Sequence, residues 1–175
     1  RWEKSGGQQL TGKTIGIIGC GHIGSDLIEL LTPFKCTLLV NDIVDKSKFC
    51  LSHEATQTNL KTLVSESNLI SLHVPLTTLT KDMVDENFLS DMKSDAYLIN
   101  TSRGGIVNEK DLKKALEQKK IAGAAIDVFA VEPPSDEEFI NLPNLASTPH
   151  IGGNAREAVE AMGLSAIDHL VAFFK

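Results

Sequence analysis

The chain has 175 residues, of which 42% are hydrophobic and 23% are charged. This composition excludes a disordered chain, a collagen and a coiled coil, and the length predicts one domain with a core of its own. There are 17 Lys and Arg against 23 Asp and Glu, so the formal net charge is −6, and the charges are dispersed. Nucleic acid is therefore not an expected partner.

The three cysteines, Cys20, Cys36 and Cys50, favour a reducing compartment. Their odd number and the lack of a Cys-x-x-Cys pair argue against a disulfide framework and against a zinc site, so no metal is expected. No apolar run approaches the roughly 20 residues that a membrane-spanning helix needs. These features predict a cytoplasmic protein without a membrane partner.

Short apolar runs alternate with helical patterns along the whole chain. Such alternation predicts an α/β fold, in which right-handed crossovers connect parallel strands in a doubly wound sheet. Ligands of such sheets bind at the carboxyl ends of the strands, so the residues that follow each strand are the first site candidates. The expected strands are Thr14–Ile18, Thr37–Val40, Leu69–His73, Ala96–Asn100, Ala124–Asp127 and Leu145–Ser147.

The first expected helix follows the first strand. Ile23, Leu27, Leu30 and Leu31 have helical spacing and are expected to share one buried face. Thr32-Pro33 should end this helix, because proline cannot continue it.

Two later helices are also indicated. One follows Asn108, a candidate N-cap, and has its apolar positions between Leu112 and Leu116. The last begins at Asn154, which forms a capping-box pattern with Glu157, and is expected to run to the end of the chain.

A glycine-rich turn, Gly19-Cys20-Gly21-His22-Ile23-Gly24, joins the first strand to the first helix. In this context Gly19 allows a tight turn, Gly21 lets a pyrophosphate approach the backbone, and Gly24 lets the helix pack on the strand. The free N–H groups of the helix N-terminus favour the same anion. The turn predicts a dinucleotide site; a purely structural turn is the alternative.

Asp42 follows the second strand and lies 42 − 24 = 18 residues after Gly24. An acidic residue at about this spacing binds the ribose 2′-hydroxyl of the cofactor and repels a 2′-phosphate. No Arg or Lys follows before Lys46, so NAD is expected rather than NADP. The alternative is that Asp42 only caps a loop.

Three further residues follow expected strands and have side chains suited to dehydrogenase chemistry. Arg103 has a guanidinium that can bind a substrate carboxylate through two hydrogen bonds. His150 is a candidate general acid and base, and Glu132 is a candidate partner for its imidazole. Each residue taken singly is also compatible with a structural role.

Four signatures together make the sequence resemble the NAD-binding domain of the D-isomer-specific 2-hydroxyacid dehydrogenases, which has the Rossmann fold. The resemblance covers nearly the whole chain. It rests on Leu10–Thr14 leading into Gly19–Gly24, on His73–Thr77 with Thr80, on Asn100–Glu109, and on Asp127–Pro134 followed by Thr148–Gly153.

The resemblance implies an oxidoreductase that moves a hydride reversibly between NAD(H) and a small D-2-hydroxy or 2-oxo acid. Arg103 would bind the substrate carboxylate, His150 would be the acid and base, and Glu132 would tune its proton affinity. Asp127 would hold the nicotinamide carboxamide. The implied cofactor contacts are Gly19, Gly21, His22, Ile23, Gly24, Asp42, Val74, Thr101, Ser102, Arg103, Asp127, His150, Gly152 and Gly153.

The resemblance also implies a second domain. Relatives build a substrate-side domain from segments before and after the NAD-binding domain, so residues 1–175 are expected to form the NAD-binding domain alone. Such a chain should bind NAD(H) and catalyse poorly by itself. A homodimer is expected, with Glu132–Asn144 and the region of Trp2 as candidate contacts.

Other functions are weighed against this one. An NAD(H)-sensing co-repressor shares the fold and can keep the same three residues. A short-chain dehydrogenase needs Tyr-x-x-x-Lys, whereas Thr101 stands four residues after Tyr97. Formate dehydrogenases typically have Gln in place of Glu132. Phosphoglycerate, hydroxypyruvate or glyoxylate, and lactate activities stay open, and His73 is interpreted as structural or cofactor-side.

Overall fold

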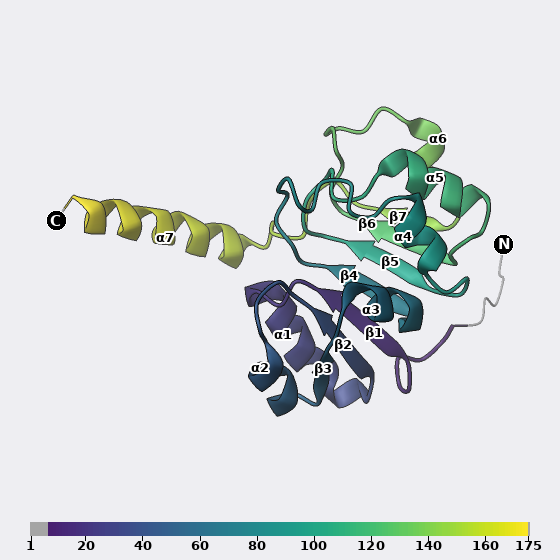
Figure 1. Ribbon diagram of the computed structural model, residues 1–175. Helices are drawn as coiled ribbons and strands as arrows, with labels where there is room; N and C mark the ends of the chain where they lie inside the picture. The colour runs from purple at the N-terminus through teal and green to yellow at the C-terminus, as the bar shows by residue number, and fades with distance from the viewer. Residues whose placement is uncertain (1–6, 175) are drawn as a thin grey trace.

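The computed structural model describes residues 7–174 (Figure 1). Its seven strands form one parallel sheet in the order β3-β2-β1-β4-β5-β6-β7. The order reverses between β1 and β4, so the predicted doubly wound sheet is confirmed. The strands are β1 (Thr14–Ile18), β2 (Thr37–Asn41), β3 (Ala55–Gln57), β4 (Leu69–Leu72), β5 (Tyr97–Asn100), β6 (Gly123–Ile126) and β7 (Leu145–Ser147).

Seven α-helices and one 3₁₀ turn lie between and after these strands in the described part of the chain. Proline ends α1 as predicted, because Pro33 lies in the 3₁₀ turn η1 that follows it. The elements are α1 (His22–Leu31), η1 (Thr32–Phe34), α2 (Ser47–Ser52), α3 (Leu60–Glu66), α4 (Glu86–Asp91), α5 (Glu109–Glu117), α6 (Glu137–Ile140) and α7 (Arg156–Phe173).

Helices α1 to α6 pack on the sheet around two separate cores. Successive strand residues point to opposite faces, so Ile17 lies in one core and Ile18 in the other. The first core includes Ile28 of α1 and residues of α2. The second and larger core includes Leu98 of β5, Leu112 of α5 and residues of α3, α4 and α6. The β1–β3 half is thus covered on one face by α1 and α2.

The predicted strand ends are nearly correct. His73, Ala96 and Asp127 lie one residue outside β4, β5 and β6, whereas Asn41 and Gly123 belong to strands. β3 was not predicted, because it has only three residues and only one of them is buried. The residues after β4, β5 and β6 therefore begin their loops where the sequence places candidate site residues.

The predicted buried face of α1 is wrong at Ile23 and Leu30 but correct at Leu31. Ile23 and Leu30 are 66% and 68% exposed, whereas Gly24, Ile28 and Leu31 are buried. Both stripes have helical spacing, and Gly24 decides between them because the missing side chain lets α1 approach the turn closely. The exposed stripe instead lines an apolar groove of about 450 Å³ along β4 and β5.

The two predicted helix starts have different outcomes. Asn108 caps α5 as predicted, since its Oδ1 accepts a hydrogen bond from the N–H of Asp111 at 3.3 Å. The predicted capping box at Asn154 is wrong: its N–H donates to the carbonyl of Ile151 at 3.0 Å, which places it in a turn. α7 begins later, at Arg156.

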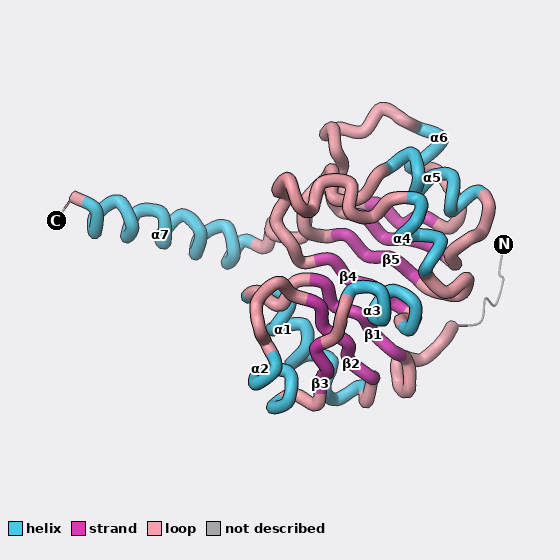
Figure 2. Tube along the Cα trace, viewed as in Figure 1, coloured by secondary structure: helices cyan, strands magenta, loops and turns pink. Residues whose placement is uncertain are grey.

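α7 extends away from the sheet, from the side where the loops after the strands gather (Figure 2). Its large apolar side chains, among the described residues, are exposed. No helix between residues 7 and 174 has both the length and the apolar character that crossing a membrane requires. The candidate contact region at Trp2 and the expected helix end at Lys175 lie outside the described residues.

Gly16 provides a test of how α3 packs on β1. A Cβ atom at this position would lie 2.5 Å from Leu63 Cδ2 and 2.5 Å from Ser67 Oγ. We expect Gly16→Ala to lower the free energy of unfolding by about 1–3 kcal/mol, because the added methyl group overpacks the core between β1 and α3. Urea denaturation measures the change.

Gly163→Ala is the matched control, because a Cβ atom at this position in α7 would have nothing within 4 Å. It should leave stability unchanged or raise it slightly, since alanine favours the helix. A Gly16→Ala variant as stable as the parent chain would contradict the described packing of α3.

Candidate active site

The glycine turn lies at the point where the strand order reverses. Gly19 has φ +94°, a conformation that glycine adopts readily. A Cβ atom on Gly19 would lie 2.5 Å from the carbonyl oxygen of His73, and one on Gly24 would collide with the carbonyl oxygen of Gly19. The turn thus packs against the chain after β4 on one side and against α1 on the other.

Gly21 is different, because no contact among residues 7–174 requires a glycine there. Its φ is −81°, and a Cβ atom there would meet no atom within 4 Å. The space that this glycine leaves open borders a cavity at the N-terminus of α1, where the N–H groups of the first turn have no helical partners. An approaching phosphate group uses both features, so this turn fits the pyrophosphate of a dinucleotide.

Asp42 reaches back to the glycine turn from the end of β2. Its Oδ2 accepts a hydrogen bond from the Cys20 N–H at 2.7 Å, and its Oδ1 accepts one from Val44 N–H at 2.8 Å. These bonds fix the carboxylate next to the turn that fits the pyrophosphate. A carboxylate in this position suits the ribose hydroxyls of a dinucleotide.

A cavity of about 340 Å³ adjoins the turn and brings together predicted residues from three strand ends. It unites the first turn of α1 with the residues after β4 and after β5. Its lining is Gly21, His22, Ile23, His73, Val74, Pro75, Thr101, Ser102 and Arg103.

Asn100 shapes the segment that carries Arg103. Its side-chain amide donates to the Arg103 carbonyl at 3.0 Å, and its Oδ1 accepts from the N–H and the hydroxyl of Ser102 at 3.1 and 2.9 Å. Asn100 is buried, whereas the Arg103 side chain is exposed and donates to the Ser102 carbonyl at 2.6 Å. The guanidinium is therefore accessible at the cavity and can bind an anion.

Glu132 and His150 form a pair across 18 residues of sequence. Glu132 Oε2 lies 2.9 Å from His150 Nδ1, and Glu132 Oε1 accepts a hydrogen bond from the Phe129 N–H at 3.0 Å. The His150 bond, followed by the Phe129 bond, holds the pKa of Glu132 below its ordinary value. Because Nδ1 faces Glu132, Nε2 is the ring nitrogen left to exchange a proton.

Asp127 ties down the loop that carries His150. Its oxygens accept hydrogen bonds from the Thr148 hydroxyl at 2.5 Å and from the N–H groups of Ile151 and Gly152 at 2.8 Å each. Burial alone would raise the pKa of Asp127, but these bonds and the nearby His150 outweigh it and lower the pKa. The predicted contact with a nicotinamide carboxamide stays a prediction.

The predicted residues thus lie at one edge of the sheet, but they are not all in contact with one another. Within residues 7–174, Arg103 and His150 form no hydrogen bond with each other, and Glu132 and His150 do not line the 340 Å³ cavity. Gly104 connects the two regions, because a Cβ atom there would collide with the carbonyl oxygen of Phe129. The Arg103 segment therefore packs against the loop of Glu132.

His73 lies between the cavity and the apolar groove. Its Nε2 is 2.9 Å from the hydroxyl of the buried Ser71, and burial lowers the pKa of His73. A neutral, hydrogen-bonded imidazole agrees with the interpretation of this residue as structural or cofactor-side.

Two residues of the site were not predicted, Asn100 and Thr148. Both side chains hold a loop in place rather than face a ligand. The sequence offers one signal for such a role: Asn100 is a polar residue at the end of an apolar strand. None of the His, Cys, Asp and Glu residues among 7–174 form a group of three or more that could hold a metal ion.

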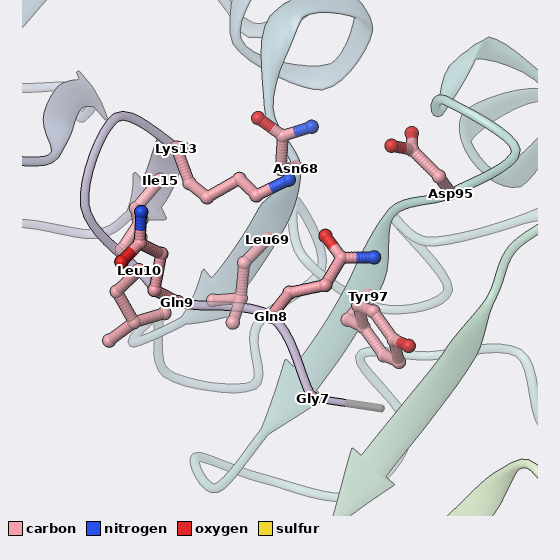
Figure 3. Close-up of a pocket in the computed structure, with 10 residues that line it drawn as sticks. All are labelled: Gly7, Gln8, Gln9, Leu10, Lys13, Ile15, Asn68, Leu69, Asp95 and Tyr97. Atoms are coloured by element: carbon pink, nitrogen blue, oxygen red, sulfur yellow. The ribbon is translucent and has the colours of Figure 1, made fainter. Parts of the chain in front are cut away.

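A second cavity, of about 310 Å³, lies at the opposite edge of the sheet (Figure 3). Lys13, Asn68 and Asp95, which line it, precede β1, β4 and β5. Doubly wound sheets bind their ligands at the carboxyl ends of the strands, so this cavity is not the candidate active site.

Asp127 provides a test of how the loop that carries His150 is held. We expect Asp127→Asn to lower the free energy of unfolding at pH 7 by about 1–3 kcal/mol, because an amide nitrogen cannot accept the bonds that the second carboxylate oxygen accepts. The folded pKa of Asp127 is lowered, so its contribution is present above the ordinary pKa of about 3.9 and is lost as the pH falls through the folded value.

Urea denaturation at pH 7 and in acid measures both effects, and the difference between variant and parent should shrink in acid. Asp95→Asn, at the exposed amino edge of the sheet, is the control. If the free energies of unfolding of variant and parent differ by the same amount at both pH values, the conclusion that Asp127 stabilises the loop as a carboxylate is contradicted.

Comparisons with known proteins identify the family to which this chain is similar. The family described as D-isomer specific 2-hydroxyacid dehydrogenase, NAD binding domain, matches residues 1–152. A glyoxylate reductase of Thermococcus litoralis is 42% identical over 169 residues, which are 97% of this chain and 51% of the relative. A D-3-phosphoglycerate dehydrogenase of Dictyostelium discoideum is 39% identical over 178 residues, 99% of this chain and 43% of the relative.

A solved structure is similar over the same range. The D-lactate dehydrogenase of Aquifex aeolicus complexed with NAD and lactic acid matches with a TM-score of 0.89 and 30% identity, over 99% of this chain and 57% of that one. The chain spans about half the length of the curated relatives that it matches. With a family match over residues 1–152, the chain belongs to the D-isomer specific 2-hydroxyacid dehydrogenases, as an NAD-binding domain.

Proposed function

We propose that this chain is the cofactor-binding part of an enzyme that oxidises a D-2-hydroxy acid or reduces the corresponding 2-oxo acid. The observation that carries the proposal is the hydrogen bond of 2.9 Å between Glu132 and His150 at the carboxyl edge of the sheet. A histidine paired with a carboxylate is suited to proton transfer at neutral pH. When bound, NAD(H) supplies or accepts the hydride.

In the proposed reduction, the Arg103 guanidinium binds the substrate carboxylate and orients the 2-oxo group. Protonated His150 donates the Nε2 proton to the oxygen that becomes the hydroxyl. In the oxidation, neutral His150 takes the hydroxyl proton at Nε2. Glu132 stabilises the imidazolium and fixes the Nδ1 proton in both directions.

The proposed cofactor contacts follow the same edge of the sheet. Gly19, Gly21 and Gly24 hold the turn, His22 and Ile23 meet the pyrophosphate, and Asp42 binds the ribose hydroxyls. Nearer the nicotinamide we assign Val74, Thr101, Ser102, Arg103, Asp127, His150, Gly152 and Gly153. Support comes from the shared cavity lining and from the open space beside Gly21 and Gly153.

The wider setting of the chain is also proposed. The domain comprises residues 1–175 and works with a substrate-side domain, a division supported by the share of its relatives that the chain spans. We propose a homodimer, supported by the family resemblance. We propose that it is cytoplasmic, supported by the three free cysteines.

The substrate is proposed only as a class. Relatives are named glyoxylate reductase, D-3-phosphoglycerate dehydrogenase and D-lactate dehydrogenase, all of which act on small hydroxy or oxo acids. The matches give no support to the NAD(H)-sensing co-repressor.

Cofactor choice can be tested on this chain by calorimetric titration with NADH and with NADPH. We expect NADH to bind at least tenfold more tightly, because the Asp42 carboxylate repels a 2′-phosphate. Asp42→Ala should weaken NADH binding by about 10- to 100-fold, through the loss of charge-assisted hydrogen bonds. Asp95→Ala should leave binding unchanged, and equal affinity of the parent chain for the two nucleotides would refute the role of Asp42.

The catalytic roles are tested in the enzyme with its substrate domain. His150→Gln should lower kcat by about 10²- to 10⁴-fold with NADH binding retained, because only proton transfer is lost. Arg103→Gln should chiefly raise KM for the 2-oxo acid. His53→Gln, in the α2 region, is the control, and unchanged turnover in both site variants would overturn the assignments.

A further inference from the structure

Glu109 makes a contact that the proposed chemistry does not use. It is the first residue of α5 and is partly buried. Its Oε1 accepts a hydrogen bond of 2.6 Å from the N–H of Ala130, a residue 21 positions later in the chain. A charged acceptor makes this bond stronger than one between neutral groups.

Ala130 belongs to the loop that orients Glu132. Within this loop the Phe129 N–H donates to Glu132 Oε1 at 3.0 Å, and the other oxygen of Glu132 faces His150 Nδ1 at 2.9 Å. Glu109 and Glu132 therefore accept from the N–H groups of adjacent residues. Glu109 holds the loop from a different segment of the chain, whereas Glu132 belongs to the loop and is oriented by its own bond to the Phe129 N–H.

The segment from Arg103 to Glu109 is itself held firmly. The carbonyls of Gly105 and Ile106 accept from the N–H groups of Asp82 and Val84 at 2.8 and 3.2 Å. Glu109 thus anchors the Glu132 loop to a segment that also carries Arg103, and Gly104 leaves room for that loop to approach.

Helix capping does not account for the Glu109 contact. Asn108 already caps α5 through the Asp111 N–H. A glutamate in the first helical turn is stabilised there by the helix dipole in any orientation. Its side chain nevertheless reaches the loop after β6.

We propose that Glu109 is a positioning residue, which holds the loop of residues 128–132 so that Glu132 meets His150. The catalytic importance of this positioning rests on the proposed function. The structural link itself can be measured without substrate or cofactor, on the 175-residue chain.

The readout is the imidazole of His150 in ¹H–¹⁵N correlation spectra, which report whether Nδ1–H is hydrogen-bonded. Glu132→Gln supplies the reference spectrum of His150 without its carboxylate partner. We expect Glu109→Ala to shift the His150 signals toward that reference. The Ala130 amide should also exchange about 10- to 100-fold faster in Glu109→Ala, because its charged acceptor is lost.

Three further variants separate positioning from general destabilisation. Glu109→Gln keeps a side-chain oxygen that can accept from Ala130, so the His150 spectrum should stay close to that of the parent chain. Glu117→Ala removes an exposed carboxylate from the same helix and should not change the spectrum. In a Glu132→Gln background, Glu109→Ala should cause no further change at His150, since the effect passes through Glu132.

The outcomes also separate this proposal from the function proposed above. If Glu132→Gln changes the His150 signals and Glu109→Ala does not, the positioning role is refuted and the acid/base pair stands. If Glu132→Gln itself leaves the His150 signals unchanged, the pair that Glu109 would position does not exist, and both proposals fail.

Discussion

All candidate site residues depend on one constraint, the parallel order of the sheet. Parallel strands bring their carboxyl ends to one edge, so loops that are distant in sequence meet there. The reversal of strand order between β1 and β4 opens that edge beside Gly19, where the chain after β4 passes close to the glycine turn. The cavity and the Glu132–His150 pair both lie along this edge, although their residues span most of the sequence.

The loops at this edge are held mainly by buried or partly buried polar groups. Asn100 fixes the turn of Arg103, Glu109 holds the loop of Glu132, and Asp127 holds the segment of His150. Each accepts or donates bonds that backbone groups outside regular structure would otherwise lack. A rigid arrangement of this kind suits catalysis, because reacting groups must keep their geometry without help from the substrate.

Sequence predicted the features that depend on local pattern. The apolar runs gave six of the strands with ends correct within one residue, and the glycine spacing located the turn after β1. Local pattern failed where tertiary contacts decide: two apolar stripes compete on α1, and Gly24 selects the buried one. The roles of Asn100 and Thr148 were missed because their partners are loop atoms, and a sequence does not state which loop atoms a hydroxyl or an amide will reach.

The backbone at His150 explains why so many groups converge on its loop. His150 has φ +54°, in the left-handed region, which costs about 1–2 kcal/mol for a residue with a side chain. Asp127 accepts hydrogen bonds from the two N–H groups that follow His150, and Thr148, two residues before it, contributes its hydroxyl. These bonds offset the strain and keep the imidazole facing Glu132. Asp127 therefore acts on the Glu132–His150 pair through the backbone of the loop.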